Sequence, residues 1–227
     1  EVKMLSRLMS KLQAMNRKAV PFDASRFNDP VAVRTAWAPL KSGGSNFRAQ
    51  KLVRATPYRI EIRASAEAVF FYSIFLLGGL AALSGITYVN YSQGRLGLNM
   101  NTIMPVVFGT IFAAVGGVML YFGTIPVVFD KMRGMCWKGR RGPPGYPGSA
   151  GRRVMENYTA LDRVHALQII SELCSGKNST YYSYELNLVL EDGERINVAD
   201  HGKLDKLRAD AVALSQFLGK PLWDTTV

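Results

Sequence analysis

The sequence predicts an α+β membrane protein in which a two-helix transmembrane hairpin is inserted into a β domain with a C-terminal capping helix. Three observations predict this class: two long uncharged apolar blocks near the middle of the 227 residues, alternating apolar and polar residues on both sides of them, and an amphipathic pattern close to the end. With 48% hydrophobic and 20% charged residues the chain is too apolar to be disordered, and its two cysteines are too few for a disulfide scaffold.

The two apolar blocks, residues 68–89 and 103–129, contain no Asp, Glu, Lys or Arg. A helix needs about 20 apolar residues to cross a hydrocarbon core ~30 Å thick, and each block is long enough. We therefore expect a transmembrane helical hairpin over residues 67–129, with spans at about 68–89 and 103–125. Because neither span carries an ionisable side chain, neither offers a proton relay or an ion path, and we do not expect transport.

Charge indicates the orientation of this hairpin. The loop between the blocks carries Arg95 as its one charged residue, whereas Lys and Arg are frequent before the first block and after the second. Cytoplasmic loops of membrane proteins carry the excess of Lys and Arg. We therefore expect a multi-pass protein with both termini cytoplasmic, and this topology also accounts for most of the net charge of +11. Because the sequence holds no recognised nucleic-acid motif, we expect no nucleic acid as a partner.

Small residues recur at helical spacing in both expected spans. They allow helix backbones to approach closely in lipid, so they indicate helix-packing faces. Two interpretations stay open: the two helices pack on each other, or they pack on a protein partner, including a second copy in a homo-oligomer. The expected helix-packing residues are Gly78, Ala81, Ala82 and Gly85 in the first span and Gly109, Ala113, Gly116 and Gly117 in the second.

Two segments precede the β domain. Residues 20–46 are rich in Pro, Gly, Ser and Asn, which predicts an extended linker that lies over another surface. Residues 1–19 predict an amphipathic N-terminal helix, which either contacts membrane lipids or docks on a protein surface. Its expected membrane-surface contacts are the basic residues Lys3, Arg7, Lys11 and Lys18, opposite an apolar stripe of Leu5, Leu8, Leu12 and Met15.

The β domain is expected in two pieces, residues 47–66 before the hairpin and 126–227 after it. The clearest strand is 182–190, where apolar and polar residues alternate, and the Asp-Gly pair that follows is typical of a hairpin turn. Leu and Ala recur at helical spacing over 203–218, which predicts the capping helix. The other expected strands are 47–55, 58–64, 126–130, 135–139, 164–173 and a return strand through Ile196 and Val198.

Seven short strands followed by one helix is the element order of a pleckstrin-homology-like (PH-like) barrel or sandwich, whose sheet the strands before the hairpin would complete. Several stretches resemble uncharacterised bacterial two-span inner-membrane proteins with a cytoplasmic PH-like β domain: "SGGSNFRAQKLV", "VVFDKMRGMCWKG", "VHALQIISE", "YSYELNLVLEDGERINVADHG" and "ALSQFLGKPLWD". The resemblance implies a bacterial inner-membrane location and a domain that binds lipids, peptides or proteins through loops and sheet edges. It brings no catalytic motif.

Few residues are candidates for chemistry. Cys136 and Cys174 lie far apart without the ligand spacing of a zinc site, so we expect two buried free thiols, no metal and no cofactor. His165 is expected to be a hydrogen-bonded framework residue. Asp200 and His201 suggest a base with its orienting carboxylate, but no nucleophile motif accompanies them, and we expect a turn leading into the last helix.

Glycine recurs at every third residue over 139–151, as in collagen, but such a short run cannot form a triple helix. We expect an irregular loop whose flanking arginines contact lipid headgroups or an acidic partner. These are Arg140, Arg141, Arg152 and Arg153.

The expected function is therefore a non-enzymatic docking or scaffold module, anchored in the inner membrane as an accessory subunit of a larger protein complex. The alternative is a free-standing lipid- or peptide-binding sensor of PH-like type. A membrane enzyme of unrecognised kind is the third hypothesis.

Overall fold

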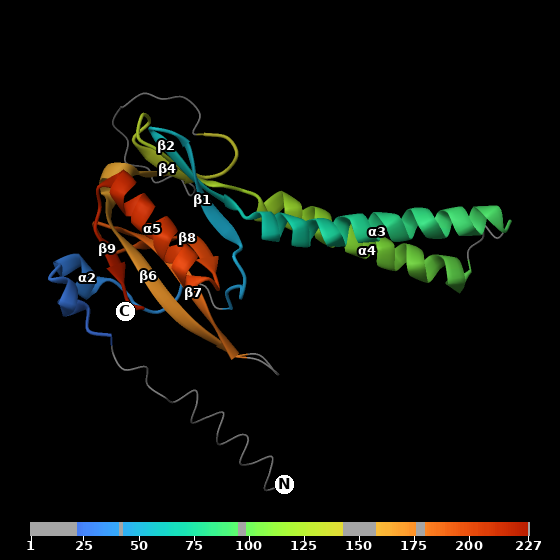
Figure 1. The fold of residues 1–227 in the computed structure, drawn as a ribbon, viewed down its shortest axis with the longest axis horizontal. Coiled ribbons are helices and arrows are strands. Elements are labelled where there is room, and N and C mark those ends of the chain that lie inside the picture. The colour runs from blue at the N-terminus through green and yellow to red at the C-terminus, as the bar shows by residue number, and fades with distance from the viewer. Residues whose placement is uncertain (1–21, 41–42, 95–98, 143–157, 176–179, 227) are drawn as a thin grey trace, which may run out of the picture.

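The computed structural model describes residues 22–40, 43–94, 99–142, 158–175 and 180–226 (Figure 1). These residues form a β domain made of two sheets and a pair of long helices that projects from it. The α+β class predicted from the sequence is confirmed.

The first sheet is completed across the helical pair. β2 and β3 are antiparallel neighbours although both long helices separate them in the chain, and Ile60 lies opposite Phe129. Strands from before and after the helices therefore share one sheet, as expected. The strand order is β1 (Gln50–Thr56), β2 (Arg59–Ala64), β3 (Val127–Asp130), β4 (Met135–Lys138) and β5 (Tyr158–Ala160).

The second sheet contains the strand with the strict alternation. Its order is β8 (Arg195–His201), β7 (Thr180–Leu190), β6 (Val164–Ser175) and β9 (Leu222–Asp224). The β7–β8 turn places Gly193 at φ 88°, a left-handed conformation that glycine adopts without steric cost. β9 pairs with β6 in parallel and follows the capping helix, so it is an addition to the expected order.

The inner faces of both sheets and helix α5 (Leu204–Leu218) enclose the core. Of the residues that recur at helical spacing, α5 buries Leu207, Ala211 and Leu214, and the helix ends at Gly219, whose left-handed φ of 68° stops it. Fully burying each such aliphatic side chain stabilises the fold by roughly 1.5–3 kcal/mol. The largest fully buried apolar side chains are Phe129, Ile60, Leu167, Ile169, Leu186, Leu188, Leu190, Leu207, Leu214 and Val128.

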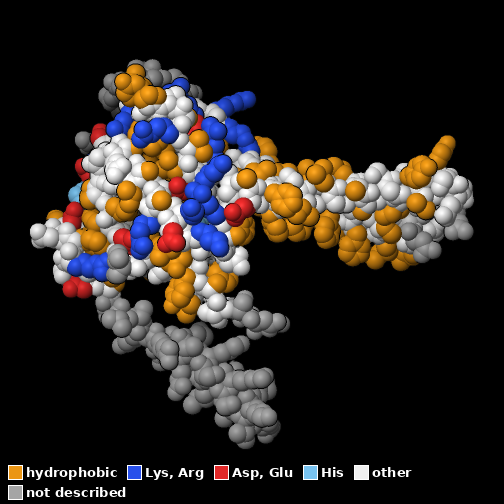
Figure 2. Space-filling model, viewed as in Figure 1, with side chains coloured by type: hydrophobic (Ala, Val, Ile, Leu, Met, Phe, Trp, Pro, Cys, Tyr) orange, Lys and Arg blue, Asp and Glu red, His pale blue; other side chains and the backbone are white. Residues whose placement is uncertain are grey.

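The two long helices, α3 (Ala66–Ser92) and α4 (Met100–Gly123), are each long and apolar enough to cross a membrane. Ser65 begins α3 by accepting a hydrogen bond from the Ala68 N–H at 3.0 Å, and Asn99 begins α4 by accepting one from the Thr102 N–H. Few of their side chains are buried by the rest of the protein, which distinguishes the pair from core helices. Figure 2 shows hydrophobic side chains along this rod.

Residues 22–40 form a strap across the outer face of the second sheet. The segment lies over another surface, as expected, but it contains a 3-10 helix, η1 (Ala24–Phe27), and a short helix, α2 (Pro30–Arg34), and so is not extended throughout. Asp23 and Asp29 cap the two helices. The buried contact joins Val31 and Ala32 to Ala166, Val189 and Trp223, with Phe27 and Trp37 packed beside them.

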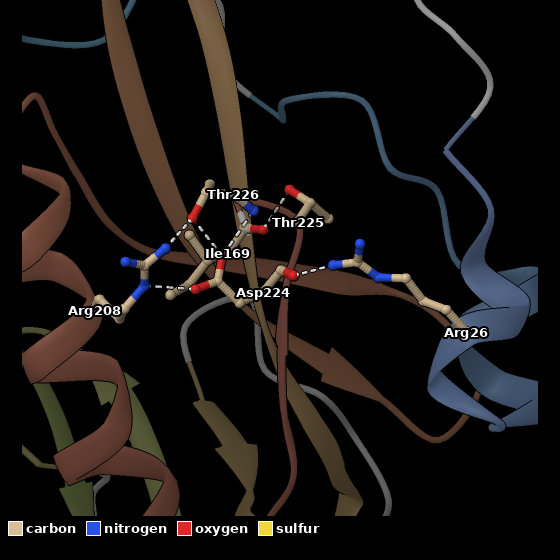
Figure 3. A network of polar contacts seen from close by, with 6 residues as sticks. All are labelled: Arg26, Ile169, Arg208, Asp224, Thr225 and Thr226. Atoms are coloured by element: carbon tan, nitrogen blue, oxygen red, sulfur yellow. Dashed lines mark hydrogen bonds and ion pairs between the residues drawn. The ribbon is translucent and has the colours of Figure 1, made fainter.

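Strand β9 is tied to its neighbours by polar contacts on both sides (Figure 3). Arg208 of α5 donates to the Asp224 carboxylate at 2.7 Å, and Arg26 of the strap donates to the Asp224 carbonyl oxygen. The Thr225 hydroxyl donates to the Ile169 carbonyl oxygen at 2.9 Å. The C-terminal segment therefore holds the strap, the second sheet and α5 together.

Candidate functional site

The most distinctive polar surface surrounds the base of the rod, where α3 leaves β2 and α4 enters β3. We call it the basic collar and define it as Arg59, Arg63, Lys138, Arg140 and Arg141. Two hollows open there. The first, about 420 Å³, is lined by Arg59, Glu61, Arg63, Ala64, Val69, Thr124, Pro126 and Arg140. Figure 2 shows Lys and Arg side chains gathered on the domain next to the rod.

The geometry of the collar follows from the sheet. Arg59, Glu61 and Arg63 alternate along β2 and therefore share one face of it. The Glu61 carboxylate accepts a hydrogen bond from Arg59 Nε at 2.8 Å and another from Arg63 Nε at 2.6 Å. This arrangement holds both guanidinium groups at the hollow.

Glu61 is almost fully buried between these two arginines. Burial raises the pKa of its carboxyl, but the hydrogen bond from Arg63 and the charges of Arg63 and Arg59 outweigh burial, so the pKa of Glu61 lies below its usual value. Glu61 is therefore ionised at neutral pH. With three arginines and one glutamate, the lining of this hollow keeps a positive excess.

Arg140 fixes the collar to the end of α4. Its guanidinium donates to the Tyr121 carbonyl oxygen at 2.6 Å and to the Thr124 hydroxyl at 2.8 Å, and it lies 4.9 Å from the centre of the Tyr121 ring. An arginine in this position satisfies carbonyl groups that the helix end leaves without partners. A second hollow, about 850 Å³, is lined by Tyr121, Ile125, Lys138, Gly139, Arg140 and Arg141.

This arrangement suits an anion. Guanidinium groups present forked N–H donors that match the oxygens of phosphate and carboxylate, and three of them converge on the first hollow. Among the described residues, no group of three or more His, Cys, Asp or Glu side chains could hold a metal ion.

The structure describes some of the membrane contacts predicted from the sequence but not others. Lys3, Arg7, Lys11 and Lys18 lie outside the described residues, as do Arg95, Arg152 and Arg153. Arg140 and Arg141 lie in the collar. Arg59 and Arg63, which sequence reasoning missed, are ordinary strand residues whose role appears only when β3 and the end of α4 are placed beside β2.

Some of the expected helix-packing residues face the partner helix and others do not. A Cβ atom at Gly109 or Gly116 would meet atoms of α3 at 2.9 and 2.2 Å, and Ala113 contacts Gly79 of α3, so these three residues face the partner helix. Gly78, Gly85 and Gly117 have nothing within 4 Å of such an atom, and Ala81 and Ala82 are exposed. For α3 the expected stripe is therefore wrong as the hairpin interface, because Gly79 is the residue that meets α4.

The remaining candidates for chemistry do not assemble into a site. Asp200 accepts a hydrogen bond from the Ser183 hydroxyl at 2.7 Å, whereas His201, the next residue of the strand, accepts one from the Lys203 N–H. Neighbouring strand residues point to opposite faces, so Ser183, Asp200 and His201 form no triad. Asp200 and His201 lie at the end of β8 rather than in the expected turn.

The framework residues behave as expected. His165 Nε2 lies 2.7 Å from an Asp29 carboxylate oxygen. Both cysteines are buried and free, Cys136 in β4 and Cys174 in β6. Burial raises the pKa of the Cys136 thiol to about 12, so this thiol stays protonated and unreactive at neutral pH.

The resemblance to two-span inner-membrane proteins stays a prediction. No protein-family model, curated protein or solved structure matches this chain.

Proposed function

We propose that this protein is a non-enzymatic docking module of the bacterial inner membrane, whose PH-like β domain is held against the cytoplasmic lipid surface by binding anionic headgroups at the basic collar. α3 and α4 cross the bilayer, and both termini lie in the cytoplasm. The observation that carries the proposal is the convergence of Arg59, Arg63 and Arg140 on one hollow at the base of an apolar two-helix rod.

The position of the collar supports a lipid ligand. Arg63 lies two residues before Ser65, the cap of α3, and Arg140 is bonded to the last turn of α4. When the apolar helices occupy the hydrocarbon core, these guanidinium groups lie at headgroup level. Tyr121 beside Arg140 is 61% exposed, and tyrosine is the residue type that favours the membrane interface.

The charge of the collar supports an anionic lipid. The cytoplasmic leaflet is negatively charged, and each Lys or Arg held near such a surface contributes about 1 kcal/mol of attraction. The hollow combines this attraction with fixed hydrogen-bond donors, because Glu61 and the end of α4 hold the guanidinium groups in place. Phosphate is the group that such donors match.

Lipid retention by the full-length chain tests this proposal. The chain is reconstituted in nanodiscs of phosphatidylcholine and phosphatidylglycerol, released into mild detergent and weighed by native mass spectrometry. Arg63→Gln/Arg140→Gln removes two charges, worth about 2 kcal/mol, and is expected to reduce bound phosphatidylglycerol roughly thirtyfold. Arg59 is left in place, so that Glu61 keeps a partner.

The matched control is Arg34→Gln/Arg163→Gln, which removes the same charge beside the β7–β8 turn of the second sheet, at positions that line neither hollow. This control should retain phosphatidylglycerol like the unchanged protein. Equal retention by both double variants, or equal retention of phosphatidylglycerol and phosphatidylcholine by the unchanged protein, would show that the collar is not a headgroup site.

A second candidate function, an accessory subunit of a larger membrane complex, is favoured by one observation. The stripe of Gly78, Ala81, Ala82 and Gly85 is exposed and turned away from α4, which leaves a small-residue face open to another helix. Gly78→Leu should then remove a partner that co-purifies in mild detergent, whereas Leu77→Ile should not. Capture of a second copy would indicate a homo-oligomer, and the absence of any co-purifying protein from the unchanged chain would exclude this function.

A further inference from the structure

The hairpin of β6 and β7 extends past the rest of the second sheet. Tyr184 of β7 pairs with His201, the last residue of β8, but β7 begins at Thr180. The β6–β7 ladder therefore continues beyond β8 through the pairs of residues 180–183, roughly 13 Å at ~3.3 Å per residue. This projecting end of the ladder is the hairpin tip.

The hairpin tip lies on the same side of the domain as the base of the rod. The Gly202 N–H, just after β8, donates to the Phe47 carbonyl oxygen at 3.2 Å, and the Phe47 ring lies 6.1 Å from the ring of Phe71 in α3. The end of β8 is therefore next to α3, and the tip extends past this end. Figure 1 shows the far ends of β6 and β7 at the level along the long axis where α3 begins.

The apolar side of β7 becomes exposed at the tip. Along β7 the core-facing side carries Leu186, then Tyr184, then Tyr182, and the exposed fraction rises from 0% at Leu186 to 54% at Tyr182. Tyr182 lies opposite Leu173 of β6, which is 57% exposed, and the Tyr182 and Tyr184 rings stack. A leucine and a tyrosine are thus left side by side at the end of the core face.

The other face of the tip is polar and already occupied. The Glu172 carboxylate accepts a hydrogen bond from the Gly43 N–H, and the Tyr181 hydroxyl donates to the Gly44 carbonyl oxygen at 2.8 Å. The acidic group nearest to Leu173 is therefore bonded on the opposite side of the hairpin. Among the described residues of the tip, the exposed large apolar side chains, Leu173 and Tyr182, lie on the other side.

We propose that the hairpin tip is a second membrane contact, in which Leu173 and Tyr182 insert into the boundary between headgroups and acyl chains of the leaflet that the collar faces. Leucine gains from leaving water, and tyrosine places an apolar ring in lipid with its hydroxyl at the wet boundary. The inference rests on the membrane anchoring proposed for α3 and α4, but not on headgroup binding by the collar. Together with the rod, such a contact fixes the tilt of the β domain.

Depth-dependent fluorescence quenching tests the proposal. The full chain, with Cys136→Ala and Cys174→Ala, is placed in nanodiscs of phosphatidylcholine alone, so that a failure of the collar leaves the readout intact. A single environment-sensitive label is attached at Tyr182→Cys, or at Met132→Cys as the matched control. Met132 is 73% exposed in the β3–β4 turn, at the end of β3 away from α4. A label at Leu77→Cys in α3 reports insertion of the rod.

Lipid carrying a quencher near the headgroup should quench the label at residue 182 about threefold more than the label at 132, and aqueous iodide should show the reverse order. Strong iodide quenching at residue 182, or protection from both quenchers, overturns the inference. When lipid with a quencher midway along the acyl chain quenches the label at 77 but lipid with a headgroup quencher does not quench the label at 182, only the tip contact fails. When neither the label at 77 nor the label at 182 is quenched by lipid, both the tip contact and the proposed anchoring by α3 and α4 fail.

Hydrogen exchange of the unchanged protein gives a second measurement that requires no substitution. Backbone amides of β6 and β7 near the tip should exchange more slowly in nanodiscs than in detergent, whereas those of the β3–β4 turn should not change. Equal exchange at the tip in both environments contradicts the lipid contact.

Discussion

Ile60 and Phe129 are opposite neighbours in the β2–β3 ladder, and both are fully buried. The chain between them forms both apolar helices. The core of the β domain is therefore assembled from segments on either side of the rod. The rod is consequently attached to the domain at two adjacent strands rather than through a flexible linker.

Phe129→Ala should destabilise the β domain by about 3–5 kcal/mol, because it removes a fully buried aromatic side chain and leaves a cavity in the core. Urea unfolding in mild detergent, followed by tryptophan fluorescence, measures the change. Met132→Ala, three residues further on and 73% exposed, is the control and should change stability by less than about 0.5 kcal/mol. Similar losses in both variants would show that the strands do not share a packed core.

Gly79→Ala should weaken the association of α3 with α4 by about 1–3 kcal/mol, since the added methyl group would lie 2.4 Å from the Ala113 backbone nitrogen and 2.6 Å from the Gly109 carbonyl oxygen. The neighbouring change Gly78→Ala places its methyl group in open space and should leave the association unchanged. Thermal unfolding of the two variants in detergent provides the comparison. A greater loss in Gly78→Ala would mean that α3 presents its other face to α4.

Stability should fall as the pH is lowered from 6.5 towards 4 because of His201. Burial, assisted by the charge of Arg48 and opposed by Asp210, lowers the pKa of His201 to about 4. The unfolded chain binds a proton near its usual value of about 6.5 while the folded protein does not, so folding is favoured fully above that pH and progressively less below it.

The shift corresponds to about 3 kcal/mol across the whole range, of which about 2 kcal/mol is lost by pH 5. His201→Leu should flatten this dependence in urea unfolding at pH 5, 6 and 7. A slope that is the same with and without the imidazole would contradict the assignment to His201.

Trp37→Ala should release the strap from the second sheet. The Trp37 ring lies 5.4 Å from the Phe27 ring and 5.9 Å from the Trp223 ring, and its Nε1 donates to the Ala32 carbonyl oxygen at 2.9 Å. The substitution should reduce the free energy that holds the strap on the sheet by about 3 kcal/mol. This change would be measured as faster proteolysis within residues 22–40. Val33→Ala, at an exposed position of the same segment, should be cleaved at the rate of the unchanged protein.

The strands and helices that could be predicted from the sequence are those whose residues form a recognisable pattern along the chain. The alternation over 182–190 predicts β7 because one face of it is buried, and the absence of charge predicts α3 and α4. β9 was missed because three residues after a proline carry no period, and its parallel pairing with β6 depends on where α5 returns the chain. Helix α2 of the strap did have a signal, Asp29 followed by Pro30, which is typical of a helix start.

The collar could be predicted only in part. Arg140 and Arg141 were expected to contact lipid headgroups or an acidic partner. Arg59 and Arg63 join them through the pairing of β2 with β3, which no local pattern reports. The same limit applies to α3. Glycines 78 and 79 are adjacent, and helical spacing alone cannot indicate which of them faces α4, because this depends on the crossing of the two helices.

The measurement that tests the account most directly is the sidedness of two single cysteines, Gln93→Cys just after α3 and Met132→Cys in the β3–β4 turn, with a membrane-impermeant maleimide. Both positions are exposed, and the native thiols are buried. The account predicts that the cysteine at 93 reacts from outside intact spheroplasts, whereas that at 132 reacts only in inverted membrane vesicles. Reaction of both from the same side would contradict a rod that crosses the bilayer.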